Sequence, residues 1–439
     1  MDQLNGSLSF LVGLYAPSFR PEVFRMFRLM LGAWIVCLGR RTVSRVWETT
    51  GLSGHVDHSA AFRLFSQAAW NWDELCRILI LQICASLLPG TEIWLVVDDT
   101  LCHKRGARVA FGGMFLDAVL STKKKKAFRY GNNWVTLGIV VKLPFRQDRY
   151  YCLNVLWRVF KKQGQKTRAE HRSKSQLAAE MIKKIAGWLP GSTLRVVADV
   201  AYIGRHLLKN RPSNVQLIGP VRGDAALTEP CPADSGRRKI GERLPTPQDI
   251  LDGDDSRWPE EAIRFRHLKG EKELMIKVVR NVCWYHAAGP TSVMFVLIRD
   301  PKGEWRDEYL LSTDTSLSVQ DVLAGYCRRW SVEVAYADTK GMLGFHEPEV
   351  WCASSVQRAH PMAWFVGSLV VLWYVLHGGS HTTPQRHRPW YKHKPEVTFA
   401  DMLATCRYQL WENWLANSAS PAELDQRRAW LMEYLATAT

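Results

Sequence analysis

Acidic residues close two apolar runs in this sequence. Asp98 and Asp99 follow Trp94–Val97, and Asp199 follows Leu194–Ala198. A carboxylate at the end of a buried strand is costly to desolvate unless it is paired or binds a cation. A single Asp at such a place more commonly caps a helix or a turn. Ligands of open α/β sheets bind where strands end at one edge, so the repeated pattern predicts a shared cation site.

A third acid, Glu333, lies in Val319–Lys340, which is predicted as one long helix. At 100° per residue, Tyr326, Arg329, Glu333 and Lys340 fall within an arc of about 60°. Ion pairs along a solvent-exposed face would explain the charges, but they do not predict the aligned phenol. Carboxylates are hard ligands that suit Mg²⁺ or Mn²⁺. Two such ions about 3.5–4 Å apart can activate the attacking oxygen and stabilise the leaving oxygen of a phosphodiester.

The charge balance favours a polyanionic partner. The 439 residues include 58 Lys and Arg against 42 acids, a net charge of +16, which favours nucleic acid. Residues 101–180 hold 18 of these cations and 4 acids. A lone lysine run commonly faces solvent, but this concentration favours contacts to a phosphate backbone. The predicted contacts are Lys123, Lys124, Lys125, Lys126 and Arg129.

The order of predicted elements indicates a mixed α/β fold. Three strands are expected within 93–157, followed by a helix at 176–188, a strand at 194–198, a short helix and a strand at 215–219. This is the element order of a ribonuclease-H-like domain. Further strands at 273–285, 292–298 and 308–312 predict an inserted β subdomain. The 47% hydrophobic and 23% charged composition excludes a mainly disordered chain.

Helical regions are expected to flank this core. Residues 1–90 show helical spacing, and a short helix opened by Thr42 before a turn at Gly51 could belong to a helix-turn-helix or to a plain helical cap. The predicted division is a helical DNA-end-binding domain at 1–90, the first part of the core at 91–221, the β insertion at 222–314, the last part of the core at 315–376 and a helical region at 377–439. The apolar run Pro361–Leu376 is expected to be a buried core helix, because a membrane span needs about 18 residues or more.

Four positions carry a resemblance to a known family. Tyr326, Arg329, Glu333 and Lys340 fit the signature Y-(2)-R-(3)-E-(6)-K. This resembles bacterial insertion-sequence transposases of the DDE superfamily, the family-four group and its relatives. Asp199-Val-Ala-Tyr202 is similar to the second acidic motif of that family, and Asp99-Thr100 is similar to the first. The resemblance covers about residues 90–375.

The resemblance implies a cut-and-paste DNA transposase. Asp99, Asp199 and Glu333 would hold two Mg²⁺ ions, with Mn²⁺ able to substitute, and hydrolysis at the transposon end would precede attack of the 3′-hydroxyl on target DNA. Tyr326, Arg329 and Lys340 would contact phosphates near that end. The implied partners are double-stranded DNA, as terminal inverted repeats and as target, and a second copy of the chain in a homodimer. No membrane partner is expected, and the implied location is the bacterial cytoplasm at the nucleoid, in keeping with cysteines that form no CxxC pair.

Some assignments stay open in the sequence. Asp98 and Asp99 project from opposite faces of a strand; Asp99 is preferred because it directly precedes Thr, and Asp98 is the alternative. Arg328 is a second candidate phosphate contact, although it misses the signature register. If hairpin formation requires a base flipped onto an aromatic ring, the motif alignment favours Tyr309, with Trp305 and Trp284 as the alternatives.

Two other functions compete with transposition. One is a metal-dependent nuclease on the same fold that hydrolyses DNA without joining strands. The other is a domesticated DNA-binding protein without catalysis, against which an intact set of three acids argues.

Overall fold

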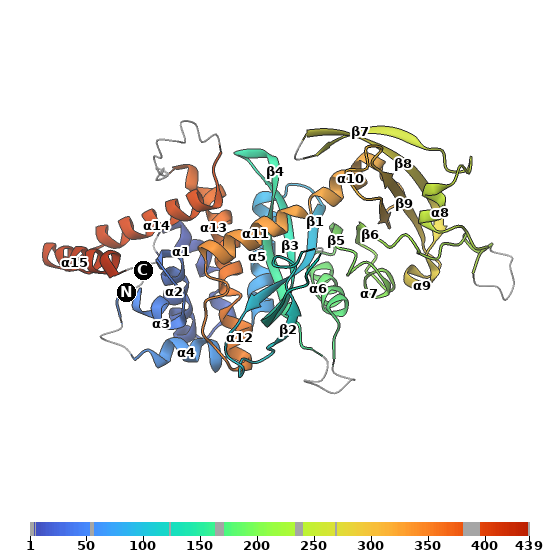
Figure 1. Cartoon of the computed structure of the whole chain (residues 1–439). Helices are drawn as coiled ribbons and strands as arrows, with labels where there is room; N and C mark the ends of the chain where they lie inside the picture. Colours follow the sequence, from blue (N-terminus) through green and yellow to red (C-terminus); the bar gives the residue numbers. More distant parts are fainter. Residues whose placement is uncertain are drawn as a thin grey trace.

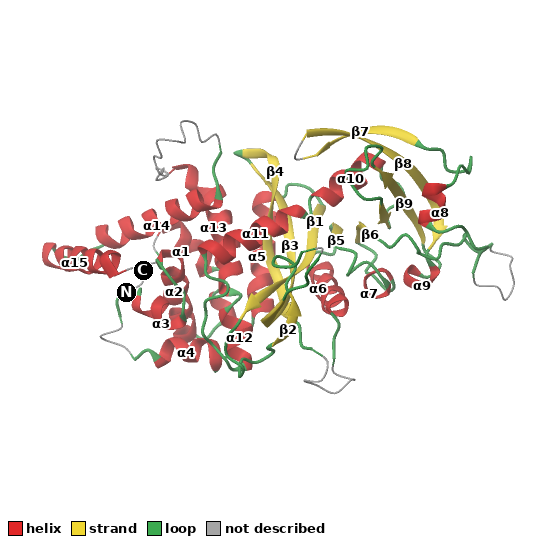
Figure 2. Cartoon of the chain, viewed as in Figure 1, coloured by secondary structure: helices red, strands yellow, loops and turns green. Residues whose placement is uncertain are grey.

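The computed structural model describes residues 4, 6–52, 57–122, 124–162, 171–232, 240–267, 270–380 and 396–437. In this part of the chain a large mixed sheet is covered by helices on both faces (Figures 1 and 2). The strands are β1 (Glu92–His103), β2 (Gly113–Leu116), β3 (Phe128–Leu143), β4 (Arg146–Val159), β5 (Thr193–Ala198), β6 (Val215–Pro220), β7 (Glu261–His267), β8 (Gly270–Cys283), β9 (Ser292–Arg299) and β10 (Glu308–Ser312).

The sheet has the strand arrangement of a ribonuclease-H-like domain. Strand β3 pairs antiparallel with both β4 and β1, β1 is parallel to β5, and β5 is parallel to β6. Beyond β6 the sheet continues through β10, β9, β8 and β7, and β10 joins β6 in antiparallel pairing. The predicted mixed α/β class is therefore confirmed, and the strands that follow β6 in the sequence extend the same sheet.

Strand β1 is longer than the sequence predicted. Its parallel pairing with β5 ends at Val97 opposite Ala198, but its antiparallel pairing with β3 continues to His103 opposite Gly131. Asp98 and Asp99 therefore lie inside a strand, at the point where one of its two neighbours stops. The expectation that they end the strand was wrong, because pairing with β3, a non-local contact, carries the strand further.

Two groups of helices cover the sheet. The helices are α1 (Gly6–Gly13), α2 (Pro21–Val36), α3 (Val43–Glu48), α4 (Ser59–Ser66), α5 (Trp72–Leu87), α6 (Lys174–Trp188), α7 (Arg205–Leu208), α8 (Pro247–Asp252), α9 (Tyr285–Ala288), α10 (Val319–Cys327), α11 (Trp330–Met342), α12 (Ala353–Ala359), α13 (Met362–His377), α14 (Phe399–Ala416) and α15 (Pro421–Thr437), with short 3₁₀ turns η1 (Ala16–Ser18) and η2 (Gly378–Ser380). Helices α5, α11 and α13 pack on β4, and α6 packs on the opposite side beside α7 (Figure 1).

The N-terminal and C-terminal helices form one body. The indole nitrogen of Trp34 donates a hydrogen bond to the carbonyl of Leu343 at 2.9 Å, and Arg407 donates to the carbonyl of Ile35 at 2.7 Å. Thr42 caps α3 by accepting from the backbone N–H of Arg45 at 3.1 Å, as the sequence indicated. The bond from Arg407 to Ile35 joins α14 to α2, and the bond from Trp34 joins α2 to the end of α11.

Helix α13 is the centre of this body. Thirteen of its residues, Met362 through Tyr374, are buried, which confirms the core helix predicted at 361–376. The stretch Ala353–His377 is long and apolar enough to cross a membrane, but 89% of its apolar window is buried inside the protein. That burial is typical of the core helix of a folded domain.

The long helix predicted at 319–340 is wrong, because the chain forms two helices, α10 and α11, that meet at Arg328 and Arg329. Around this junction the backbone N–H groups of Arg328, Arg329 and Ser331 bond to carbonyls three residues earlier, which tightens the turn. The guanidinium of Arg328 lies 3.8 Å from the ring centroid of Trp94 and 4.7 Å from that of Tyr150. This cation–π contact between distant segments holds the junction.

Candidate active site

Asp98 and Asp99 point to opposite faces of β1, and different helices cover these two faces. Asp98 lies opposite Thr136 of β3, whose hydroxyl is 2.5 Å from the hydroxyl of Tyr336 on α11. Asp99 lies opposite Val135 and contacts Lys174, the first residue of α6. Asp98 therefore shares a face with the helix that carries Glu333, and Asp99 faces the other layer of helices.

Asp98 and Glu333 meet at one guanidinium. Nη1 of Arg329 lies 3.0 Å from Oδ2 of Asp98 and 3.4 Å from Oε1 of Glu333. Burial raises the pKa of Asp98 to about 6, and the charges of Asp99 and Asp199 add to this, while Arg329 opposes it. A carboxylate that is buried near other acids favours a nearby cation.

Asp199 belongs to the same group. Val97 of β1 lies opposite Ala198 of β5 in parallel pairing, so the next residue on each chain segment brings Asp98 and Asp199 side by side. The carboxylate of Asp199 accepts a hydrogen bond from the backbone N–H of Val200 at 2.7 Å. Its negative charge raises the pKa values of both Asp98 and Arg329. Asp98, Asp199 and Glu333 are therefore electrostatically linked around Arg329.

Asp99, by contrast, is held by three donors. Its carboxylate accepts from Nζ of Lys174 at 2.6 Å, from the hydroxyl of Tyr202 at 2.8 Å and from Nδ2 of Asn133 at 3.0 Å. Tyr202 stands three residues after Asp199, so this bond ties the exit of β5 to β1. A carboxylate with this many donors is already satisfied without a metal ion.

The family resemblance implies a divalent ion, and the acids fit one in their chemistry. Among the described residues, no three His, Cys, Asp or Glu side chains are gathered closely enough to hold an ion. Arg329 instead supplies a positive charge where Asp98 and Glu333 converge. Carboxylate oxygens of the kind that surround the Arg329 guanidinium are also the ligands that a hard divalent ion prefers. The Glu333 side chain is 45% exposed and therefore has room to turn toward such an ion.

Tyr326 and Tyr309 border a cavity of about 740 Å³ that also reaches Asp199. Burial raises the pKa of Tyr326 to about 12, with a contribution from Glu308. The ring of Tyr309 is buried against Gly223, and its hydroxyl donates to Oε1 of Gln248 at 2.8 Å. Tyr309 therefore lines the cavity but is packed on one side.

The remaining predicted contacts lie in different surroundings. Lys340 donates to the hydroxyl of Thr100 at 2.6 Å, and burial lowers its pKa. Arg328 is enclosed at the α10–α11 junction. Trp305 is 40% exposed beneath Lys272, and Trp284 directly precedes α9. None of these four predicted residues is brought to the contact between Arg329 and the acids.

The lysine run lies on the connection between β2 and β3. Lys124, Lys125, Lys126 and Arg129 are exposed, and Lys123 lies outside the described residues. The backbone N–H of Lys125 donates to the hydroxyl of Thr122 at 3.0 Å, so the connection has a defined turn. These cations lie at or before the start of β3, whereas Asp98 pairs in the middle of that strand.

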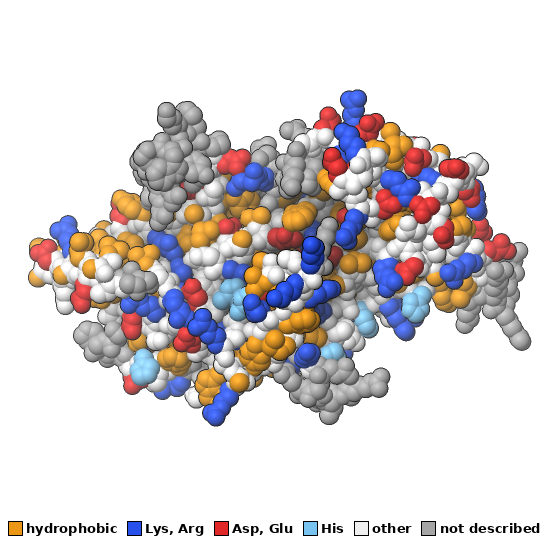
Figure 3. Space-filling view, viewed as in Figure 1, with side chains coloured by type: hydrophobic (Ala, Val, Ile, Leu, Met, Phe, Trp, Pro, Cys, Tyr) orange, Lys and Arg blue, Asp and Glu red, His pale blue; other side chains and the backbone are white. Residues whose placement is uncertain are grey.

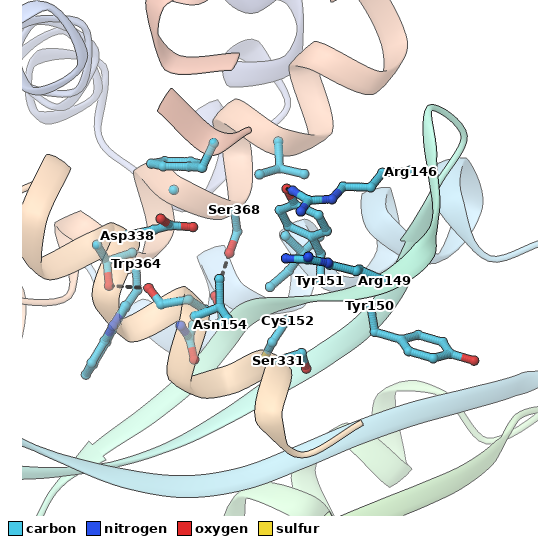
Figure 4. Close-up of a pocket in the computed structure, with 17 residues that line it drawn as sticks. Arg146, Arg149, Tyr150, Tyr151, Cys152, Asn154, Ser331, Asp338, Trp364 and Ser368 are labelled. Carbon is cyan, nitrogen blue, oxygen red and sulfur yellow. Dashed lines mark hydrogen bonds between the residues drawn. The ribbon is translucent and has the colours of Figure 1, made fainter. Parts of the chain in front are cut away.

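A small cavity of about 80 Å³ lies behind α11 (Figure 4). Asp338 of α11 and Arg146 of β4 border it from opposite sides. Burial raises the pKa of Asp338 to about 6, and Arg146 opposes this. Residues of α11 and α13 both line the cavity, and the two helices also pack directly against each other. The acids that meet at Arg329 do not line it.

Sequence reasoning missed two features of the site. Glu308, the first residue of β10, borders the same cavity as Asp199, and burial raises its pKa. Asn133 reaches Asp99 only because β3 pairs beside β1. Neither residue belongs to a sequence motif, and only the strand register could have indicated them.

The mixed sheet and its covering helices are the fold of ribonuclease-H-like nucleases and transposases. A family model described as DDE superfamily endonuclease matches residues 14–283, and the chain belongs to this family. The match begins within the N-terminal helices and includes Asp98, Asp99 and Asp199, whereas Glu333 lies beyond it. No curated protein matches the chain.

Proposed function

We propose that this protein is a cut-and-paste DNA transposase in which Asp98, Asp199 and Glu333 form the acidic site. The observation that carries the proposal is the meeting of Asp98 and Glu333 at Nη1 of Arg329, with Asp199 beside them. Asp98 takes the place that the sequence motif gave to Asp99, because Asp98 shares a face with Glu333. The family-four signature supports the assignment of Glu333.

These three side chains would hold divalent ions, Mg²⁺ or Mn²⁺. When bound, such ions activate the attacking oxygen and stabilise the leaving oxygen of a phosphodiester. Asp98 and Asp199 come from adjacent strands and are fixed by the sheet, while Glu333 lies on a helix and is more exposed than Asp98. Asp98 and Asp199 would set the position of the bound ions, and Glu333 would supply the remaining carboxylate.

Arg329 would change partners during this process. In the structure it neutralises Asp98 and Glu333. Once those carboxylates hold a divalent ion, its guanidinium would be released toward a DNA phosphate, which its fork of donors suits. Tyr326 and Lys340 would contact the same end of the DNA, as the signature implies.

Transposition requires double-stranded DNA as terminal repeats and as target, and two copies of the chain in one complex. A nuclease on this fold would cut the same ends but would not join them to target DNA. A strand-transfer assay with a precleaved end and a supercoiled plasmid separates these functions, because only a transposase yields joined product.

The central experiment replaces Glu333. The variant Glu333→Gln should abolish Mg²⁺-dependent cleavage of the terminal DNA and leave DNA binding nearly intact. Glu412→Gln, an exposed change on α14, is the matched control and should cut normally. Normal cutting by Glu333→Gln would overturn the proposed mechanism.

A further inference from the structure

The hairpin of β2 and β3 presents apolar side chains to solvent. Met114, Leu116 and Phe128 are 50%, 45% and 54% exposed, and Val119 in the connection is 88% exposed. Leu116 lies opposite Phe128, and Met114 lies opposite Tyr130. The side chains of Met114, Leu116 and Phe128 therefore form one face, here called the hairpin face.

The hairpin face lies on the same side of the sheet as Asp98. Strand β3 pairs with β1 without a register shift, and Asp98 lies opposite Thr136. Because side chains alternate along a strand, Phe128 and Thr136 point to the same face. The two residues are about 26 Å apart along the strand at about 3.3 Å per residue.

The connection that supports this face is held by hydrogen bonds. Asp117, whose side chain is 5% exposed, lies 2.6 Å from Nε2 of His103 and accepts from the N–H groups of Val119 and Leu120. The hydroxyl of Ser121 donates to the carbonyl of Asp117 at 2.6 Å. The apolar side chains are thus displayed on an ordered support.

The charge around the hairpin face is complementary to DNA. Between residues 101 and 146 the sequence has one acid, Asp117, which is buried. Lys124, Lys125, Lys126 and Arg129 are exposed beside the apolar residues. Hydrophobic and basic side chains lie side by side over β2 in the space-filling view (Figure 3).

From these contacts we infer that the hairpin face inserts into DNA as an apolar wedge while the flanking cations contact phosphates. Apolar side chains between base steps unstack and kink a duplex, and base stacking on an aromatic ring tolerates any sequence. This inference rests on the proposed function, since it supplies a second contact to the DNA bound at Asp98.

The test measures binding in EDTA, so that it does not depend on cleavage. The probes are a 30-base-pair duplex and the same duplex with three central mismatches. The full-length protein should prefer the mismatched duplex by about tenfold, because its bases are easier to unstack. The variant Met114→Ser/Leu116→Ser/Phe128→Ser should lose this preference and keep its affinity for the paired duplex.

Two controls sharpen the test. Met432→Ser/Leu435→Ser changes exposed apolar residues of α15 and should keep the preference. Lys124→Gln/Lys125→Gln/Lys126→Gln should weaken binding to both duplexes and reduce its salt dependence. A preserved mismatch preference in the hairpin triple variant would overturn the inference. A change of that variant from dimer to monomer with unaltered DNA binding would also overturn it, because the hairpin face would then be a contact between two copies of the chain.

Discussion

Two neighbouring carboxylates on β1 lie in opposite surroundings. Asp99 accepts three hydrogen bonds, from Lys174, Tyr202 and Asn133. Asp98 accepts from the backbone N–H of Asp99 at 2.7 Å and from one guanidinium that it shares with Glu333. The carboxylate of Asp99 is fully hydrogen-bonded by side chains of the protein. The carboxylates of Asp98 and Glu333 share one guanidinium and can accept further donors or a cation. The proposed function therefore assigns Asp98 to the ion site and Asp99 to its support, because Asp99 already accepts from three side chains.

The largest effect should come from exchanging the two acids for amides. Asp98→Asn should lower the cleavage rate by about 10³-fold or more, equivalent to about 4 kcal/mol. Asp99→Asn should lower it by about 10- to 100-fold, as is usual for a residue that supports a ligand. Single-turnover cleavage of terminal DNA measures both, and a larger loss in Asp99→Asn would reverse the comparison.

The second effect concerns stability against pH. Asp98 has a pKa of about 6 in the folded protein against 3.8 for the ordinary group. A raised carboxyl pKa favours folding at low pH, and this contribution is lost as pH rises from about 4 through about 6. Without divalent ions, the free energy of unfolding of Asp98→Asn relative to the wild type should therefore be up to about 3 kcal/mol higher above pH 7 than at pH 4. Urea unfolding in EDTA at several pH values measures both free energies of unfolding. A difference between variant and wild type that stays constant with pH would contradict the raised pKa of Asp98.

A smaller effect is expected from Arg329. Because its guanidinium lies between Asp98 and Glu333, Arg329→Gln should remove a competitor for a divalent ion. The affinity for Mn²⁺ should rise by about tenfold, which is about 1.4 kcal/mol. Titration calorimetry measures it, with Arg428→Gln on α15 as the exposed control. Weaker Mn²⁺ binding would show that Arg329 supports the ion site.

The smallest effect should come from Tyr202→Phe. This change removes only the hydrogen bond from the Tyr202 hydroxyl to Asp99. The free energy of unfolding should fall by about 1 kcal/mol, with cleavage reduced only slightly. Thermal unfolding and a cleavage assay measure the two quantities, and a loss of cleavage as large as that of Asp98→Asn would contradict a supporting role.

Local patterns predicted much of this fold. Strand β10 has the bounds expected from sequence, and α13 is the expected core helix. The junction between α10 and α11 could not be predicted, because it depends on the packing of Arg328 between Trp94 and Tyr150. Alternation separated Asp98 from Asp99, but only the placement of α11 identified the face that carries Glu333.

Binding of Mn²⁺ distinguishes Asp98 from Asp99 as the ligand of a divalent ion. Electron paramagnetic resonance of the full-length protein would measure bound Mn²⁺ in the wild type, Asp98→Asn, Asp99→Asn and Glu333→Gln. Asp98→Asn and Glu333→Gln should lose tight Mn²⁺ binding, while Asp99→Asn should keep it. Retained Mn²⁺ binding in Asp98→Asn together with its loss in Asp99→Asn would show that Asp99, and not Asp98, is the ligand.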